Sequence, residues 1–298
     1  MIGVLIQPTN DRVEVPTIMR ALEPQVVDAV FAAVEPHLPG PSRSHPLGCH
    51  RPRTSDRLVF ELILVRLVTG CSWVTAERLC AMKVSDTTAR ARRDEWVELG
   101  VFAKVAEEAI RAYDKVIGLD LCDVALDGSI HKAPGGGDGT GPNPTDRGRT
   151  GWKWSIATEG AGIPVGWTAD GANRHDQKLL APTLDQVKER GLLQEIGTLH
   201  LDRGYDADTV RQTLKDTYKI ADAVIARKRS AGRAATKRAV PLGLRWPVER
   251  TNAWLANFGQ LRRNTDRKST HRLAQFALAL AVLIAAKLIA WRDRWSFA

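Results

Sequence analysis

Three acidic residues in very different settings could carry metal-dependent chemistry. Asp127 and Asp202 each end a short apolar run, and Glu249 lies at the expected start of a helix. Two Mg²⁺ ions held by such carboxylates can activate a nucleophile and stabilise the leaving oxygen in phosphodiester cleavage. Two aspartates held side by side would repel each other, and that repulsion favours a bound cation. Each acid could equally be an ordinary turn residue or helix cap.

The charge balance of the chain favours a polyanionic partner. The 298 residues include 43 Lys and Arg against 34 Asp and Glu, which gives a formal net charge of +9. Neutralising phosphates with such residues releases counterions, so nucleic acid is the expected partner. A soluble enzyme that happens to be basic is the alternative.

Other classes of site and location fit the sequence less well. The cysteines form no Cys-x-x-Cys pair, so no zinc ribbon is expected. The apolar stretch 273–291 is interrupted by Gln275 and Lys287, which predicts a buried core helix and no membrane span. No signal peptide pattern opens the chain, so we expect a cytoplasmic, nucleoid-associated bacterial protein.

Residues 1–118 are predicted to form an all-α DNA-binding region. A turn at 70–73 precedes a short helix, and Ser85 is a typical cap for the next helix. The second helix is rich in arginine. A short helix, a turn and an arginine-rich helix are typical of a DNA-binding helix-turn-helix. An ordinary helical bundle with a solvated basic face is the alternative. The predicted DNA contacts in this helix are Arg90, Arg92 and Arg93.

Residues 119–298 change to an α/β pattern. Apolar runs predict strands at 122–126, 152–158, 164–169, 198–201 and 221–226. Periodic segments predict helices at 177–194, 206–218, 247–260 and 270–291. This order predicts a mixed sheet flanked by helices, which resembles the ribonuclease H-like fold. In that fold the first and fourth strands are neighbours.

Two polar loops interrupt the α/β pattern. The Gly-rich loop 133–150 is followed by a strand where a phosphate-binding loop needs a helix, so we expect it to bend away and admit substrate. The second loop could be simply solvated, but its nearness in sequence to Glu249 favours contact with a DNA backbone. Its basic residues are Arg227, Lys228, Arg229, Arg233, Lys237 and Arg238.

Several linked motifs resemble the bacterial DDE transposases, with the nearest likeness to the insertion-sequence-five group. The likeness spans residues 50–291 and covers the helical region, both aspartate motifs and the segment after Glu249. The motifs are Leu126-Asp-Gly-Ser, Arg174-His-Asp, Leu201-Asp-Arg-Gly-Tyr-Asp, Arg245-Trp-Pro-Val-Glu-Arg-Thr-Asn-Ala-Trp-Leu and Leu261-Arg-Arg-Asn.

The resemblance implies that Asp127, Asp202 and Glu249 are catalytic ligands of two Mg²⁺ or Mn²⁺ ions. Arg245 and Glu249 match the Arg and Glu of the group's Tyr-Arg-Glu-Lys signature. The chain departs from that signature, because Leu242 holds the Tyr position and Ala256 the Lys position. We expect Arg262, Arg263 or the basic loop 227–238 to replace the missing Lys at the DNA end.

The resemblance also implies a function and its partners. A DDE transposase cleaves double-stranded DNA at the terminal inverted repeats of an insertion element and joins the ends to target DNA. Two ends must be held together, so a homodimer or higher assembly on DNA is expected. The alternatives are a catalytically inactive, transposase-derived DNA-binding protein and a structure-specific nuclease.

Overall fold

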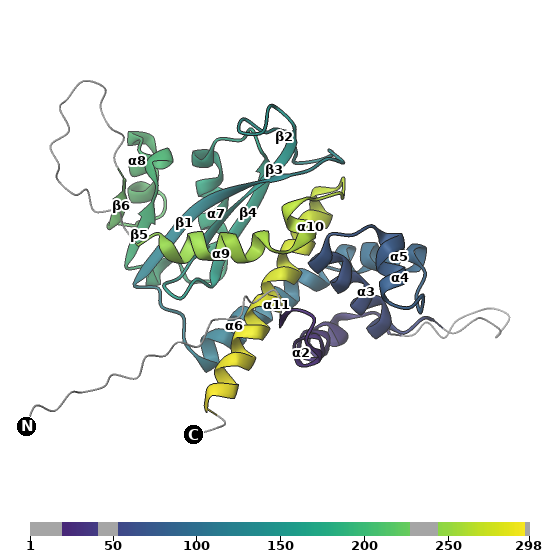
Figure 1. Ribbon diagram of the computed structural model, residues 1–298. Coiled ribbons are helices and arrows are strands. Elements are labelled where there is room, and N and C mark those ends of the chain that lie inside the picture. The colour runs from purple at the N-terminus through teal and green to yellow at the C-terminus, as the bar shows by residue number, and fades with distance from the viewer. Residues whose placement is uncertain (1–19, 41–52, 227–243, 296–298) are drawn as a thin grey trace, which may run out of the picture.

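The computed structural model describes residues 20–40, 53–226 and 244–295, shown as coloured ribbon in Figure 1. The six basic residues of loop 227–238 and Leu242 lie outside the described residues, so the predictions made for them stay untested.

The N-terminal region is helical, as predicted. It comprises α2 (Pro24–Val34), η1 (Glu35–His37), α3 (Asp56–Thr69), α4 (Trp73–Leu79), α5 (Asp86–Glu98) and α6 (Val101–Val116). The Ser72 hydroxyl accepts from the backbone N–H of Thr75, and Ser85 caps α5 by accepting from Thr88 N–H at 3.2 Å. The short α4, a turn and α5 therefore follow one another in the predicted order, because two serines supply the caps.

The second part of the chain forms one mixed sheet. Its strands are β1 (Asp123–Lys132), β2 (Gly141–Pro142), β3 (Thr150–Thr158), β4 (Pro164–Gly171), β5 (Thr198–Leu201) and β6 (Ala223–Ile225). The order is β2-β3-β1-β5-β6, with β4 paired to β3. β1 pairs antiparallel with β3 and parallel with β5, so the first and fourth predicted strands are neighbours, as expected.

Helices cover both faces of this sheet (Figure 1). One face packs on α7 (Asp176–Glu189) and α8 (Asp208–Asp216), and the core there also includes residues near η2 (Leu193–Glu195) and η3 (Arg203–Tyr205). The other face packs on α9 (Trp246–Ala256), α10 (Gly259–Arg262) and α11 (Ser269–Trp295). The predicted α/β class, with a mixed sheet flanked by helices, is confirmed.

The long helix α11 joins the helical region to the sheet. By length and composition it could cross a membrane, and 67% of its most apolar window is buried inside the protein. One continuous core runs from α2 through α6 and α11 to the sheet. The predicted boundary at residue 118 falls between α6 and β1, and a division into two domains there stays a prediction.

The first strand is longer than the sequence predicts. We expected it to end before Asp127, but β1 continues to Lys132 because β3 pairs with it along that whole length. Asp127 therefore lies inside β1, opposite Ile156, and follows the last residue that pairs with β5. The turn-residue alternative for Asp127 is wrong.

Candidate active site

Asp127 and Asp202 are brought together by parallel strand pairing. Leu126 of β1 lies in register with Leu201 of β5, and each aspartate is the next residue along its chain. Asp202 also caps η3, since its Oδ1 accepts from the backbone N–H of Gly204 at 2.6 Å. The two carboxylates are thus fixed by a sheet register and a turn, both of which are rigid constraints.

The electrostatics of Asp127 fit a site that takes up a cation. Burial raises the pKa of Asp127 to about 6, opposed by a backbone hydrogen bond from Gly128 and by the charge of Arg245. The nearby carboxylates of Asp202 and Asp176 raise this pKa further. A bound cation would remove that repulsion and keep Asp127 ionised.

Glu249 is tied to Asp127 through an arginine. Pro247 occupies the first turn of α9, where a missing N–H costs nothing, and Glu249 follows in the same turn. Arg245 places its Nη2 3.1 Å from Glu249 Oε1 and 3.9 Å from Asp127 Oδ2. The carboxylate of Glu249 is 57% exposed, so it is free to change partner.

The predicted triad is therefore assembled only in part. Among the residues the structure describes, no three His, Cys, Asp or Glu side chains are gathered closely enough to hold a metal ion. Two aspartates sit side by side, and their oxygen donors suit a hard divalent cation. The third acid pairs with Arg245 through its Oε1 and is not gathered with the two aspartates.

The start of α7 buttresses both aspartates. Lys153 is buried on β3, and its Nζ donates to Asp176 Oδ1 at 2.8 Å. Asp176 packs against Gly128, where an added Cβ would lie only 2.7 Å from that same oxygen. Gln177 donates to the carbonyl of Gly204 at 2.7 Å, beside Asp202. A side chain in place of Gly128 would therefore displace the Asp176 carboxylate from its present position.

Sequence reasoning missed Lys153 and Gln177. His175 caps α7, since its Nδ1 accepts from Gln177 N–H at 3.3 Å. A lysine in an otherwise apolar strand was the available signal, because a buried ammonium needs a partner. Tyr205 is fully buried against the acidic residues, and burial raises its pKa well above the usual value, which fits a packing role.

A wall of aromatic rings lines the α9 side of the sheet. The Trp154 indole N–H donates to Asn252 of α9 at 2.8 Å, and His131 stacks on the Trp154 ring at 3.6 Å. Burial lowers the pKa of His131 to about 3, so this imidazole is neutral. On the outer side, Arg250 and Lys287 lie over the half-buried Trp254 ring. This wall orients α9 and hence Glu249.

The three predicted DNA contacts of α5 differ in exposure. Arg90 is exposed and pairs with Asp86 at 2.8 Å. Arg92 and Arg93 are buried, the first pairing with Asp56 and the second with Asp266 at 3.2 Å. Two of the three guanidinium groups are thus occupied inside the protein, and this arrangement assigns them to packing rather than to DNA.

Comparison with known proteins now bears on this geometry. Residues 118–284, more than half of the chain, match the family described as Transposase DDE domain. The chain belongs to the DDE transposase family. Residues 26–106 match a family described as a transposase of IS4/5 family.

A curated relative supports the same placement. It is named as a transposase for insertion sequence element IS402, from Burkholderia cepacia, and is 40% identical over 136 residues. The aligned segment covers 44% of this chain and 61% of that protein. The resemblance inferred from the motifs is thus confirmed, and a DDE domain implies that the mixed sheet is ribonuclease H-like.

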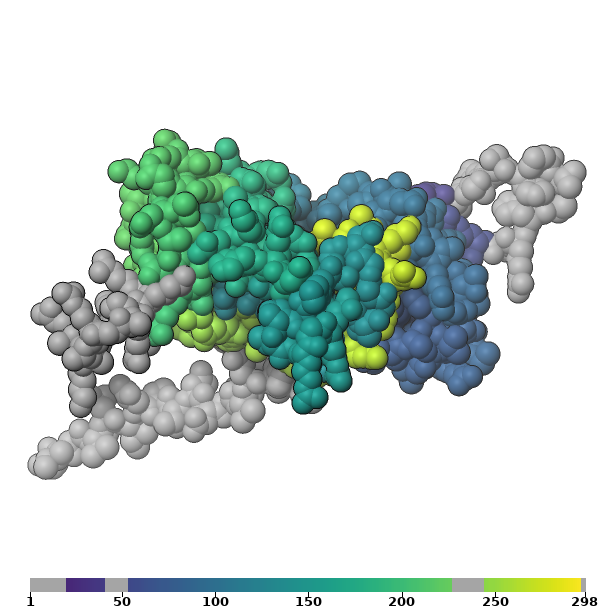
Figure 2. Space-filling view, turned by 90° about the horizontal axis from the view of Figure 1, so that it is seen from above, coloured from purple at the N-terminus to yellow at the C-terminus, as the bar shows by residue number. Residues whose placement is uncertain are grey.

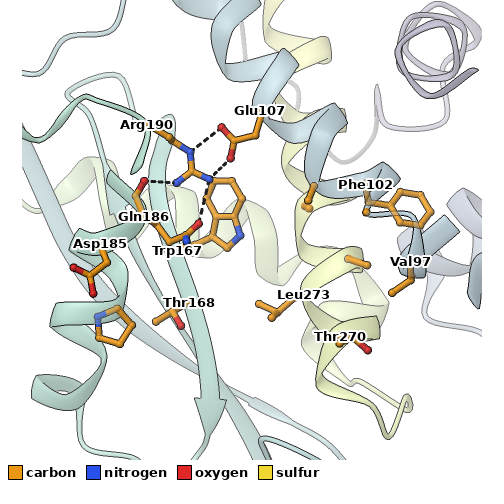
Figure 3. A pocket seen from close by; sticks show the side chains of 15 residues that line it. Val97, Phe102, Glu107, Trp167, Thr168, Asp185, Gln186, Arg190, Thr270 and Leu273 are labelled. Carbon is orange, nitrogen blue, oxygen red and sulfur yellow. Dashed lines mark hydrogen bonds and ion pairs between the residues drawn. The ribbon is translucent and has the colours of Figure 1, made fainter. Parts of the chain in front are cut away.

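A separate pocket lies outside the candidate active site. It has a volume of about 560 Å³ and opens between the helical region, α7, β4 and α11 (Figure 3). Phe102, Leu273 and Trp167 line it, and Arg190 stacks on the Trp167 ring at 4.1 Å while donating from Nε to Glu107 at 3.0 Å. None of the three predicted ligands lines this pocket.

Proposed function

We propose that this DDE transposase cleaves DNA at the ends of an insertion element and transfers the cleaved strand to a target. The observation that carries the proposal is the parallel register of β1 and β5. It places Asp127 and Asp202 directly after the paired residues Leu126 and Leu201, inside a matched DDE domain. The match to a DDE domain implies the use of divalent metal ions; two ions, Mg²⁺ or Mn²⁺, are the finer part of the proposal.

Asp127, Asp202 and Glu249 are the proposed catalytic ligands. Bound divalent ions would supply an activated nucleophile and stabilise the leaving oxygen. Asp127 and Asp202 present carboxylate oxygens from fixed backbone, whereas Glu249 turns from Arg245 toward them. Arg245, released in this way, would be available to neutralise the charge of a bound phosphate.

Double-stranded DNA is the proposed partner, both as terminal inverted repeats and as target. Residues 1–118 would bind the repeats through the helix-turn-helix, with Arg90 as its exposed arginine. Arg262 and Arg263 are exposed beyond α9 and are proposed to replace the signature Lys. A homodimer or higher assembly on DNA, and a place on the bacterial nucleoid, belong to the same proposal.

A cleavage assay on the DNA flanking the coding region tests this function. Asp127→Ala, Asp202→Ala and Glu249→Ala should each abolish Mg²⁺-dependent product while DNA binding is kept. Glu195→Ala, an exposed acid after α7, is the matched control and should cleave normally. Full activity in any of the three variants would remove that residue from the triad.

The ion pair between Arg245 and Glu249 favours one rival, a transposase-derived protein that binds DNA without cleaving it. Melting with and without Mg²⁺ separates the two functions. A rise in melting temperature that Asp127→Ala removes supports the enzyme, because a ligand stabilises the state that binds it. No response to Mg²⁺ or Mn²⁺ supports the rival.

A further inference from the structure

The Gly-rich segment after β1 is folded back on the chain between α10 and α11. The backbone N–H of Asn264 donates to the carbonyl of Lys132, and that of Asp138 donates to Arg267 at 2.9 Å. Lys132 and Arg263 form a parallel bridge. We call residues 132–150 and 262–268 together the basic projection. In Figure 2 its teal part extends outward beside the yellow segment of the later chain.

Glycine is what allows the two segments to touch. An added Cβ at Gly137, where φ is +100°, would lie 2.0 Å from the carbonyl oxygen of Arg267, and one at Gly135 would lie 2.8 Å from that of Thr265. No side chain fits at such distances. The glycines therefore let the two basic segments pack backbone to backbone and form one surface.

The tip of the basic projection is a tight turn that presents two arginines. Asn143 N–H donates to the carbonyl of Arg149 at 2.8 Å, and Gly148 N–H donates to that of Asn143. Arg147 has φ +53°, an uncommon conformation for a residue with a side chain. Both arginine side chains are exposed.

The cations of the basic projection are largely without acidic partners. Its three acids are engaged: Asp146 lies 3.8 Å from Lys132, Asp266 is buried between Arg66 and Arg93, and Asp138 interacts with the buried Arg272. Among the described residues, none forms an ion pair with the six remaining cations. These are Arg147, Arg149, Arg262, Arg263, Arg267 and Lys268.

We propose that the basic projection binds the phosphate backbone of duplex DNA near the site of cleavage. Lys132 is five residues beyond Asp127 on β1, which is about 17 Å along a strand. That length corresponds to about five base pairs of duplex. Guanidinium groups suit phosphate oxygens, and contacts to phosphates carry no sequence information, so this binding is independent of sequence. This inference rests on the proposed function and names the surface that holds its DNA.

The test compares salt dependence of binding in two double variants of the full chain. Arg147→Gly with Arg149→Ala removes two charges at the tip, and glycine suits the backbone at 147. Lys188→Ala with Lys215→Ala removes two exposed charges from the later turns of α7 and α8 as the matched control. Fluorescence anisotropy is measured on a random-sequence duplex and on the DNA flanking the coding region.

The slope of log affinity against log salt should be shallower by about 1.8 in the tip variant than in the wild type, equally on both duplexes. The control should keep the wild-type slope. Equal slopes for tip variant, control and wild type would overturn the inference, and so would a loss confined to one duplex. Melting curves must show that both variants are folded.

The same samples separate this inference from the proposed function. If the wild type cleaves DNA with Mg²⁺ while the tip variant keeps its salt slope, the basic projection has no DNA role and the enzyme stands. If the wild type neither binds nor cleaves either duplex, the proposed function itself fails.

Discussion

Arginines serve opposite purposes in the helical region and in the basic projection. Arg66 and Arg93 are buried, share the carboxylate of Asp266, and lie over the face of Trp73 at 4.4 and 5.1 Å. In contrast, Arg147 and Arg149 are exposed and meet no acid among the described residues. A net charge of +9 therefore says little about where DNA binds, because local carboxylates decide which cations are available.

The largest expected effect comes from removing the carboxylate that the two buried arginines share. Asp266→Ala leaves the buried Arg66 without an acidic partner and Arg93 with Asp94 alone, which should lower the free energy of unfolding by about 3–5 kcal/mol. Urea unfolding followed by circular dichroism measures this. Asp86→Ala, which removes the half-buried partner of the exposed Arg90, is the control and should cost less than about 1 kcal/mol. A similar loss in both would mean that burial does not distinguish the two ion pairs.

The next effect is a gain of stability at the active site. Burial raises the pKa of Asp127 to about 6, so the folded chain holds this proton more tightly than the unfolded chain, whose pKa is near 4. The contribution of Asp127 to the free energy of unfolding therefore falls as pH rises from about 4 to about 6. Asp127→Asn should remove that fall and add at most about 3 kcal/mol above pH 6.

Melting temperatures of wild type and Asp127→Asn across this pH range, without divalent ions, check the sign. The same variant should lose cleavage, because the carboxylate that destabilises the free protein is the one proposed to bind metal. If the variant is less stable than the wild type at pH 7, the carboxylate of Asp127 is stabilised in the free protein and the argument from repulsion is wrong.

A smaller effect is expected where the helical region meets the sheet region. Glu107→Gln weakens the pair with Arg190, which lies beside the pocket in Figure 3, and should cost about 1–2 kcal/mol. The estimate is modest because the glutamate is about one-third exposed. Chemical unfolding should show the loss, with Glu98→Gln on the exposed surface of α5 unchanged. If Glu107→Gln is as stable as the wild type, the ion pair with Arg190 is screened by solvent and does not stabilise the fold.

The smallest expected effect on stability concerns Arg90. Arg90→Ala should change the free energy of unfolding by less than about 0.5 kcal/mol, because its pair with Asp86 is solvent-exposed. It should still make the salt slope of DNA binding shallower by about 1 if the helix contacts a phosphate. Arg93→Met should do the reverse and affect folding more than salt dependence. An unchanged salt slope in Arg90→Ala would show that Arg90 makes no contact with a DNA phosphate.

The local sequence determined the main elements and pointed to the family. Alternating and periodic apolar residues predicted the helical region and the α/β class, because burial of one face imposes a period on the chain. The likeness of the element order to the ribonuclease H-like fold predicted that the two aspartate strands are neighbours. The motifs around Asp127, Asp202 and Glu249 predicted the DDE family, which the comparisons confirm. Caps also followed from sequence, since Ser72 and Ser85 bond within their own turns.

Only the tertiary structure decided which charges are free. Arg92 and Arg93 look like DNA contacts along the chain, but Asp266, 173 residues beyond Arg93, and Asp56 occupy them. The length of β1 likewise depended on its pairing with β3, and the closeness of the basic projection depended on carbonyls that face Gly135 and Gly137. Charge and apolar period are local properties that a sequence carries in order, whereas ion pairing and close backbone contact join residues that only folding brings together.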